Sequence, residues 1–214
     1  LIIDDANFRM NDLNFYSNEV TVKNLVNSFS VQGKVEHKRF NLEDKSLTNL
    51  LNEFNRNLKL ESLNFSSKSD FSFNLSKELK IKDIEIFSKV KLTELLILNN
   101  FKLKSFFPKI KKNISLNDNN LEIIYKKESL SIFGEGKIFF QDKADDISYE
   151  LKKTNKDLKF VSSIQINDNP LNIDFLNYDN REKNSIIIDI KGTIDKSKNS
   201  TINLFSLKEK NNIF

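Results

Sequence analysis

The sequence predicts an all-β fold, a long antiparallel meander that curves into an open apolar groove, with one or two short helices. Three observations support this fold class. Apolar and polar residues alternate with a period of two along most of the chain, which is typical of strands with one buried face. Short polar clusters separate the alternating segments about every 10 to 12 residues, the spacing expected of an all-β protein. No strand–helix–strand rhythm appears, which argues against a parallel α/β fold.

The alternating segments predict the strands in order. In the first half of the chain, one expected face carries Phe29, Val31, Gly33 and Val35; Phe71, Phe73 and Leu75; Leu79 and Ile81; Ile84 and Ile86; and Val90 and Leu92. In the second half it carries Leu121, Ile123 and Tyr125; Leu130 and Ile132; Ile138 and Phe140; Ile147, Tyr149 and Leu151; Leu158 and Phe160; Ile164 and Ile166; Leu171, Ile173 and Phe175; Ile186, Ile188 and Ile190; and Ile202 and Leu204. The opposite phase is mostly polar.

Polar clusters between these segments predict turns, because Asn and Asp adopt turn dihedrals without glycine. The clusters are Asn117 to Asn120, Asp142 to Asp146, Thr154 to Asp157, Asn167 to Pro170, and Lys196 to Ser200. A helix is predicted over 46–57, where leucines and a phenylalanine recur at helical spacing. A second helix is predicted over Thr93 to Leu98, and a bend around Pro108 within 104–112.

Composition excludes most catalytic chemistry. The chain has no Cys or Trp, one His and four Gly, but 19 Phe and 30 Asn. Cysteine catalysis, a multi-histidine metal site and a glycine-rich phosphate loop therefore cannot be built, so we expect no enzyme, no metal and no cofactor. A formal net charge of +4 is too small to indicate nucleic-acid binding.

Two polar sites are interpreted as structural. His37, flanked by charged residues, is expected to be a solvated residue at a strand end. Asp142, Asp145 and Asp146 lack the spacing of a calcium-binding loop and are expected at a polar hairpin tip. The longest apolar run, Leu95 to Leu98, is far shorter than the ~20 residues of a membrane-spanning helix.

Successive hairpin segments resemble the repeating hairpins of AsmA-like proteins, including the YhdP and TamB type. The segments are Leu130 to Phe140, Ile147 to Leu151, Leu158 to Phe160, Asn169 to Tyr178, and Ser185 to Ile194. The resemblance implies a periplasmic groove that carries phospholipid or another acyl-chain lipid between the inner and outer membranes. It also implies an inner-membrane anchor outside this segment, partners in the cell envelope, and no catalytic residues.

We therefore expect residues 1–214 to form a single β-groove segment of a larger protein, with an alternative boundary near 104–113. The residues expected to line the groove and contact lipid are Phe71, Phe73, Leu75, Ile138, Phe140, Ile147, Tyr149, Leu151, Phe160, Ile164, Ile166, Ile173, Phe175, Ile186, Ile188 and Ile190. Periodicity leaves one alternative open. Two sheets could cover each other's apolar faces in a sandwich that serves protein interaction or envelope scaffolding.

Overall fold

The computed structural model describes residues 1–10, 13–42, 59–99, 103–173, 177–180, 184–197, 199–209 and 212–213. These residues form strands, turns and loops and contain no helix. The strands are β1 (Ile2–Met10), β2 (Leu13–Asn24), β3 (Ser28–Leu42), β4 (Lys59–Ser76), β5 (Ile81–Leu98), β6 (Asn113–Lys126), β7 (Ser129–Phe139), β8 (Asp145–Lys153), β9 (Asp157–Ile166), β10 (Leu171–Ile173), β11 (Tyr178–Asn180), β12 (Ile186–Asp195), β13 (Ser200–Glu209) and β14 (Asn212–Ile213).

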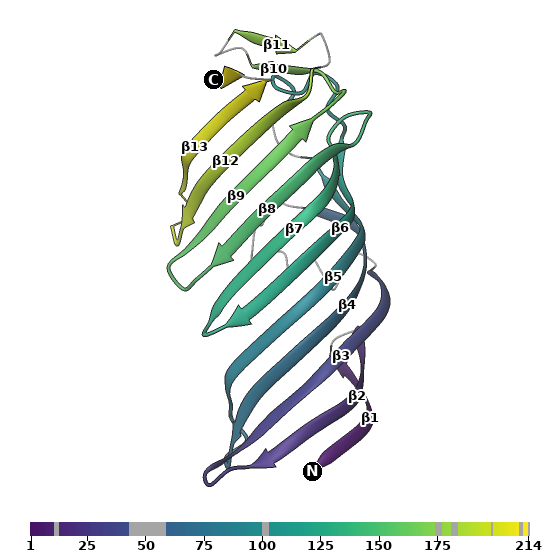
Figure 1. The fold of residues 1–214 in the computed structure, drawn as a ribbon, viewed down its shortest axis with the longest axis vertical. Helices are drawn as coiled ribbons and strands as arrows, with labels where there is room; N and C mark the ends of the chain where they lie inside the picture. The colour runs from purple at the N-terminus through teal and green to yellow at the C-terminus, as the bar shows by residue number, and fades with distance from the viewer. Residues whose placement is uncertain are drawn as a thin grey trace.

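The strands form one long antiparallel meander (Figure 1). Eleven strands, β1 to β9 followed by β12 and β13, lie side by side in chain order, and the two-residue β14 pairs with the end of β13. β10 and β11 form a separate two-stranded sheet. The predicted fold class, an all-β antiparallel meander, is confirmed.

The strand register gives the sheet an apolar face and a polar face, because residues of one phase share a side. One row across β5 to β9 pairs Val90, Leu121, Gly134, Tyr149 and Ser162. The adjacent row, on the other side of the sheet, pairs Lys89, Glu122, Phe133, Glu150 and Val161. We call the side that carries the first row the apolar face and the side that carries the second the polar face.

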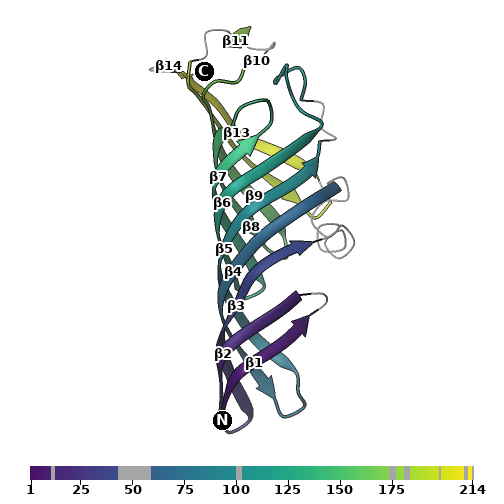
Figure 2. The same ribbon diagram turned by 90° about the vertical axis from the view of Figure 1, so that its right-hand side faces the viewer.

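The sheet is open and curved. In Figure 2 the strand ends bend toward the same side, so that the sheet has the shape of a gutter. β1 lies at one edge and β13 with β14 at the other, and the sheet does not close. The sandwich alternative is wrong for the described residues, because all eleven long strands belong to a single layer.

A cap covers the apolar face at the C-terminal end of the sheet. We define the cap as residues 103–110 together with β10 and β11, which lie at the top of Figure 1. The backbone N–H of Asn172 donates to the carbonyl of Phe106 at 2.9 Å, which joins the two parts of the cap. The core between the cap and the sheet contains Phe107, Ile114, Ile138, Phe140, Ile164, Ile166, Leu171, Ile173, Ile186, Ile188 and Leu207. Residues from β6, β7, β9, β12 and β13 contribute to this core, so the cap closes the apolar face of the sheet at this end.

Local predictions met different outcomes. The predicted helix over 46–57 lies outside the described residues. The predicted helix over Thr93 to Leu98 is wrong, because this run continues β5 and pairs with β4 on one side and β6 on the other. The bend around Pro108 and the turn at Thr154 to Asp157 are confirmed, and so is the turn after β12 for its described residues, Lys196, Ser197 and Asn199.

The polar cluster Asn117 to Asn120 is not a turn. It lies inside β6, where the register with β7 shifts between Asn117 and Asn120. Asp118 has a φ of 51°, a left-handed conformation that Asp tolerates better than most residues. A turn-forming sequence has therefore produced a bulge within a continuous strand.

Candidate functional site

The predicted groove-lining residues of the long strands share the apolar face. On β4, Phe71 and Phe73 pair with Gly33 and Val31 of β3. On β8 and β9, Ile147 pairs with Ile164 and Leu151 with Phe160. Ile164, Ile166 and Phe160 in turn face Ile188, Ile186 and Gly192 of β12. Leu75, Ile138, Tyr149 and Ile190 occupy the same phase of their strands.

Three predicted residues lie elsewhere. Phe140 follows β7 directly, and its ring stacks on Phe107 of the cap at a centroid distance of 5.0 Å. Ile173 belongs to β10, in the cap itself. Phe175 lies outside the described residues. Some residues predicted to line the groove therefore lie against the cap or within it, and not on the long strands of the sheet.

The cap divides the predicted set into two parts. Seven residues are buried in the core at the C-terminal end: Ile138, Phe140, Ile164, Ile166, Ile173, Ile186 and Ile188. Ile147 and Ile190 pack against this core and are partly buried. The cap covers the six of these that belong to the sheet or follow it, and Ile173 belongs to the cap itself, so all seven hold the cap on the sheet.

The other part of the apolar face is partly exposed. It contains the predicted Phe71, Phe73, Leu75, Tyr149, Leu151 and Phe160. The same face also carries Val90, Leu121, Ile123 and Ile132, which were predicted as strand residues but not as lining residues. We call these ten residues the open section. The same alternation of apolar and polar residues was the signal that could have placed Val90, Leu121, Ile123 and Ile132 in the site.

Aromatic rings in the open section lie over glycines of neighbouring strands. A Cβ atom on Gly134 would meet the Tyr149 ring at 2.3 Å, and one on Gly192 would meet the Phe160 ring at 2.4 Å. Gly33 stands in the same relation to Phe71, at 2.9 Å. The glycines therefore let large rings lie flat across the strands, which makes the apolar face smoother. Burial raises the pKa of Tyr149 to about 12.

His37 belongs to this face, and its predicted place as a solvated residue at a strand end is wrong. Its side chain is 9% exposed. Its ring centroid lies 5.9 Å from Phe15 and 5.6 Å from Phe65. Nearby, the hydroxyls of Ser69 and Ser88 share a hydrogen bond at 2.7 Å. Charged neighbours in the sequence suggested exposure, but alternation places those neighbours on the polar face and His37 between aromatic rings.

The three aspartates predicted at a hairpin tip separate in the structure. Asp145 is buried, and its carboxylate accepts hydrogen bonds from Nδ2 of Asn169 at 2.8 Å and from the backbone N–H of Asn167 at 3.2 Å. Burial raises the pKa of Asp145 despite these bonds. Asp146 points to the polar face, and its pKa is lowered by its hydrogen bond with Lys137. The expectation of a polar tip is therefore wrong for Asp145.

A second buried amide links the sheet to the cap. Gln141 is fully buried; its Nε2 donates to the carbonyl of Pro170 at 2.7 Å, and its Oε1 accepts from the backbone N–H of Lys109 at 2.9 Å. Asn169 also donates to the carbonyl of Lys143 at 2.8 Å. These bonds satisfy polar groups that the cap would otherwise bury without partners. The cap is thus fixed by directional bonds as well as by apolar packing.

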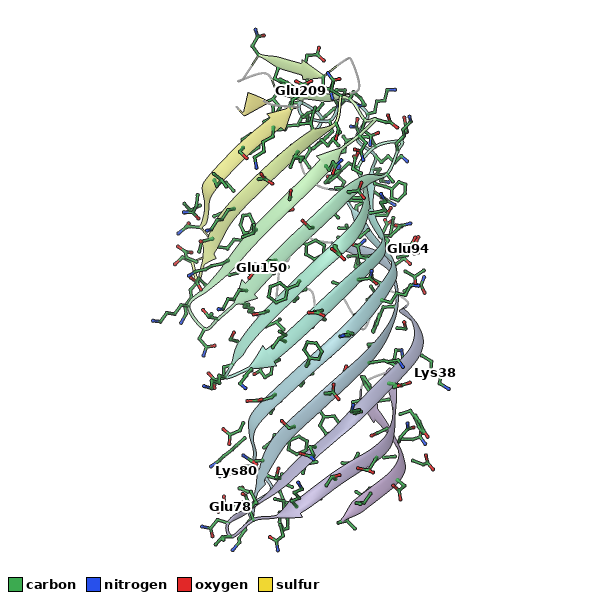
Figure 3. The ribbon with its side chains drawn as sticks, in the orientation of Figure 1. Lys38, Glu78, Lys80, Glu94, Glu150 and Glu209 are labelled. Carbon is green, nitrogen blue, oxygen red and sulfur yellow. The ribbon has the colours of Figure 1, made fainter. Side chains whose placement is uncertain are left out.

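The polar face has a mixed charge pattern. Cross-strand ion pairs join Lys68 to Glu36 at 3.1 Å and Lys126 to Glu85 at 2.9 Å, and their exposure makes each worth about 0–1 kcal/mol. Figure 3 shows charged side chains along the sheet, with Glu94 and Glu150 labelled. Acids and bases alternate here, and this arrangement does not form the basic stripe typical of nucleic-acid binding.

Depressions in the surface draw most of their lining from the polar phase. One of about 880 Å³ spans β3 to β9. Its lining includes Glu36, Lys38, Lys68, Lys89, Lys91, Glu122, Glu135 and Glu150, with Phe133 and Val161 among them. Of the predicted groove residues, Tyr149 contributes to this depression, and Phe71 and Ile147 contribute to two smaller ones. Mixed charges at this density do not suit an acyl chain.

In the described part of the chain, no three His, Asp or Glu side chains lie close enough together to hold a metal ion. Among the same residues, no helix has the length and apolar character to span a membrane.

Comparison with protein-family models, curated proteins and solved structures finds no match. Fold and site together define the chain as an open antiparallel β-meander with one apolar face.

Proposed function

We propose that the open section of the apolar face binds the acyl chains of phospholipid or a similar lipid. One observation carries this proposal. Large apolar side chains from β4 to β9 share one face of a single-layer sheet and remain partly exposed, whereas the C-terminal part of the same face is closed by the cap. An extended apolar surface of this kind is typical of a binding site.

The dimensions suit a lipid tail. The six adjacent strands that carry the open section, β4 to β9, span about 24 Å at a strand spacing of ~4.8 Å. One leaflet of a bilayer's hydrocarbon core is about 15 Å thick, so a whole tail fits across the strands. A 16-carbon chain gains on the order of 12 kcal/mol on leaving water, at ~0.8 kcal/mol per methylene. The headgroup would stay in solvent, since the face offers few charged partners.

This chemistry needs no catalytic residue, and the proposed role is non-enzymatic lipid carriage. The long antiparallel meander agrees with the architecture that the resemblance to AsmA-like proteins implies. We extend the proposal accordingly: this chain would act in the periplasm as a groove segment of an inner-membrane-anchored protein that moves lipid toward the outer membrane. Envelope proteins would be its partners at either end of the path.

Two adjacent residues of β7 provide a matched test. Ile132 lies on the apolar face, and Phe133 is exposed on the polar face. Ile132→Asp places a charge in the path of the tail and should weaken binding of a fluorescent phospholipid by roughly tenfold or more, the equivalent of two methylenes. Phe133→Asp adds the same charge to the other face and should leave binding unchanged.

Circular dichroism must show unchanged strand content in both variants. Equal binding by the two variants, with their folds intact, would contradict the proposal. Loss of binding in Phe133→Asp alone would place the lipid site on the polar face instead.

A further inference from the structure

Three serines interrupt the apolar face of the sheet. Ser67 and Ser69 lie on β4 and Ser88 lies on β5, each in the phase that carries the open section. Ser69 and Ser88 are paired across the two strands, and Ser67 is the neighbour of Ser69 on the same side of β4, where it pairs with His37 of β3. We call the three serines the serine island. Valine at these positions would continue the apolar face without burying a hydroxyl.

Large apolar side chains border the island along both strands. Phe71 pairs with Ile86 in the row on one side of it, and Phe65 pairs with Leu92 in the row on the other. Serine is shorter than any of these four residues, and Ser88 is only 8% exposed. The hydroxyls therefore lie at the floor of the apolar face, and a lipid that rests on the neighbouring rows passes directly over them.

The island has more hydrogen-bonding capacity than its internal bond uses. The hydroxyls of Ser69 and Ser88 share one hydrogen bond at 2.7 Å, in which one of the two hydroxyls donates its hydrogen. The hydrogen of the other hydroxyl is not used in this bond, and Ser67 adds a third hydroxyl beside the pair. Because a polar group that lacks a partner in an apolar setting costs free energy, this arrangement favours a ligand that brings a polar atom to the same place.

The surroundings of the island select an uncharged acceptor. In the row of the hydrogen-bonded pair, Val35 of β3 lies beside Ser69 and Ile123 of β6 lies beside Ser88, so that neither neighbour carries a charge. A phosphate group binds most strongly to Arg or Lys, whereas an ester carbonyl accepts a hydrogen bond from a neutral hydroxyl. Of the polar parts of a phospholipid, the ester carbonyls therefore match the island best.

We infer that the serine island binds the ester carbonyls of a diacyl lipid, at the point where the acyl tails enter the open section. This inference rests on the proposed function and adds the class of lipid and its position on the sheet. From β5 to β9 the sheet extends about 19 Å at a strand spacing of ~4.8 Å, which is enough for a tail that occupies about 15 Å in a bilayer leaflet. The tails thus run from the island toward β9, and the headgroup remains in solvent beyond the esters.

Two matched phospholipids test the inference on the unmodified 214-residue chain. They share the headgroup and the tail length, but one carries its tails through ester bonds and the other through ether bonds, which lack the carbonyl oxygens. In displacement of a fluorescent phospholipid, the ester lipid should bind roughly threefold to tenfold more tightly, the effect of about one hydrogen bond. Equal affinities would overturn this inference and leave the proposed function standing, whereas binding of neither lipid would overturn both.

A double variant tests whether the island causes the preference for ester bonds. Ser69→Ala combined with Ser88→Ala removes both partners of the hydrogen bond, so that neither is left unpaired and the fold should be retained. This variant should bind the ester and the ether lipid equally. Ser66→Ala combined with Ser72→Ala removes two hydroxyls from the polar face of β4 and should keep the preference. A preference that survives in the first variant, with strand content unchanged by circular dichroism, would overturn the inference, as would its loss in the second.

Discussion

The cap separates residues that stabilise the fold from residues that remain available to a ligand, and isoleucine truncation tests this separation. Ile186 on β12 is fully buried beneath the cap. Ile132 on β7 belongs to the same apolar face but is only partly buried in the open section. Ile186→Ala and Ile132→Ala make the same chemical change in these two environments.

The expected costs follow from burial. Ile→Ala removes three carbons, and their transfer alone is worth about 2.4 kcal/mol when they are fully buried. The cavity left at Ile186 adds to this, and the total should fall within about 2–5 kcal/mol. At Ile132 water can occupy the vacated space, so that no cavity forms, and partial burial should reduce the loss to about 1 kcal/mol.

Urea unfolding followed by circular dichroism measures both losses. The midpoint should fall further for Ile186→Ala than for Ile132→Ala, with the slope unchanged. An equal loss at the two positions, or a larger one at Ile132, would refute the reasoning. Such a result would mean that the open section is covered and contributes to the core.

Three further predictions concern glycine, the buried carboxylate and pH. Gly136→Ala should lower the melting temperature more than Gly134→Ala does. The new Cβ at position 136 would lie 2.6 Å from the Cα of Asn119, which is backbone, whereas the new Cβ at position 134 would meet the ring of Tyr149, which can turn away. Equal losses for the two variants would contradict this packing. Asp145→Ala leaves the buried Nδ2 of Asn169 and the partly buried N–H of Asn167 without their acceptor and should cost roughly 2–4 kcal/mol in urea unfolding; a loss below about 1 kcal/mol would show that these hydrogen bonds contribute little to stability. The pKa of Tyr149 is about 12 in the fold against about 10 unfolded, so its contribution to stability is present below pH 10 and is lost as the pH rises through 12. Between about pH 9 and 11, the free energy of unfolding should therefore fall less for Tyr149→Phe than for the unmodified chain. An identical fall for the two proteins would argue against burial of the hydroxyl.

Alternation was enough to predict the strands and the division into two faces. Its period of two directly reflects side-chain direction along a strand, and the register then aligns one face across many strands. This is why residues as distant in the chain as Phe71 and Ile188 were correctly assigned to one face. Periodicity contains no information about what covers a face, and so it left the open sheet and the sandwich as alternatives.

The failures have local physical causes. Thr93 to Leu98 was predicted to be helical, but pairing with strands on both sides decided its conformation. His37 and Asp145 were predicted to be solvated because both are polar. Phe15 and Phe65 surround the first, and the amide of Asn169 satisfies the second. Alternation already places His37 on the apolar face, so its charged neighbours misled the prediction, whereas the contact of Asp145 with Asn169 leaves no periodic signal in the sequence.

The meeting of the two parts of the cap could not be predicted. Residues 103–110 and β10 come from separate parts of the chain, and although a bend at Pro108 and alternation at Leu171 and Ile173 were predicted, neither pattern shows that the two segments lie together. Their meeting depends on single hydrogen bonds, such as the one from Asn172 to Phe106. As a result, Ile166 and Ile186 were predicted as lipid contacts on the same grounds as Tyr149, although the cap buries them.

Extraction and mass analysis of lipid from the purified 214-residue chain, together with native mass spectrometry, tests the central proposal most directly. The chain should carry phospholipid in a stoichiometric amount, and Ile132→Asp should carry much less while Phe133→Asp retains it. A folded, unmodified chain that carries no lipid, and takes up none from phospholipid vesicles, would contradict the proposal that the open section is a lipid-binding surface.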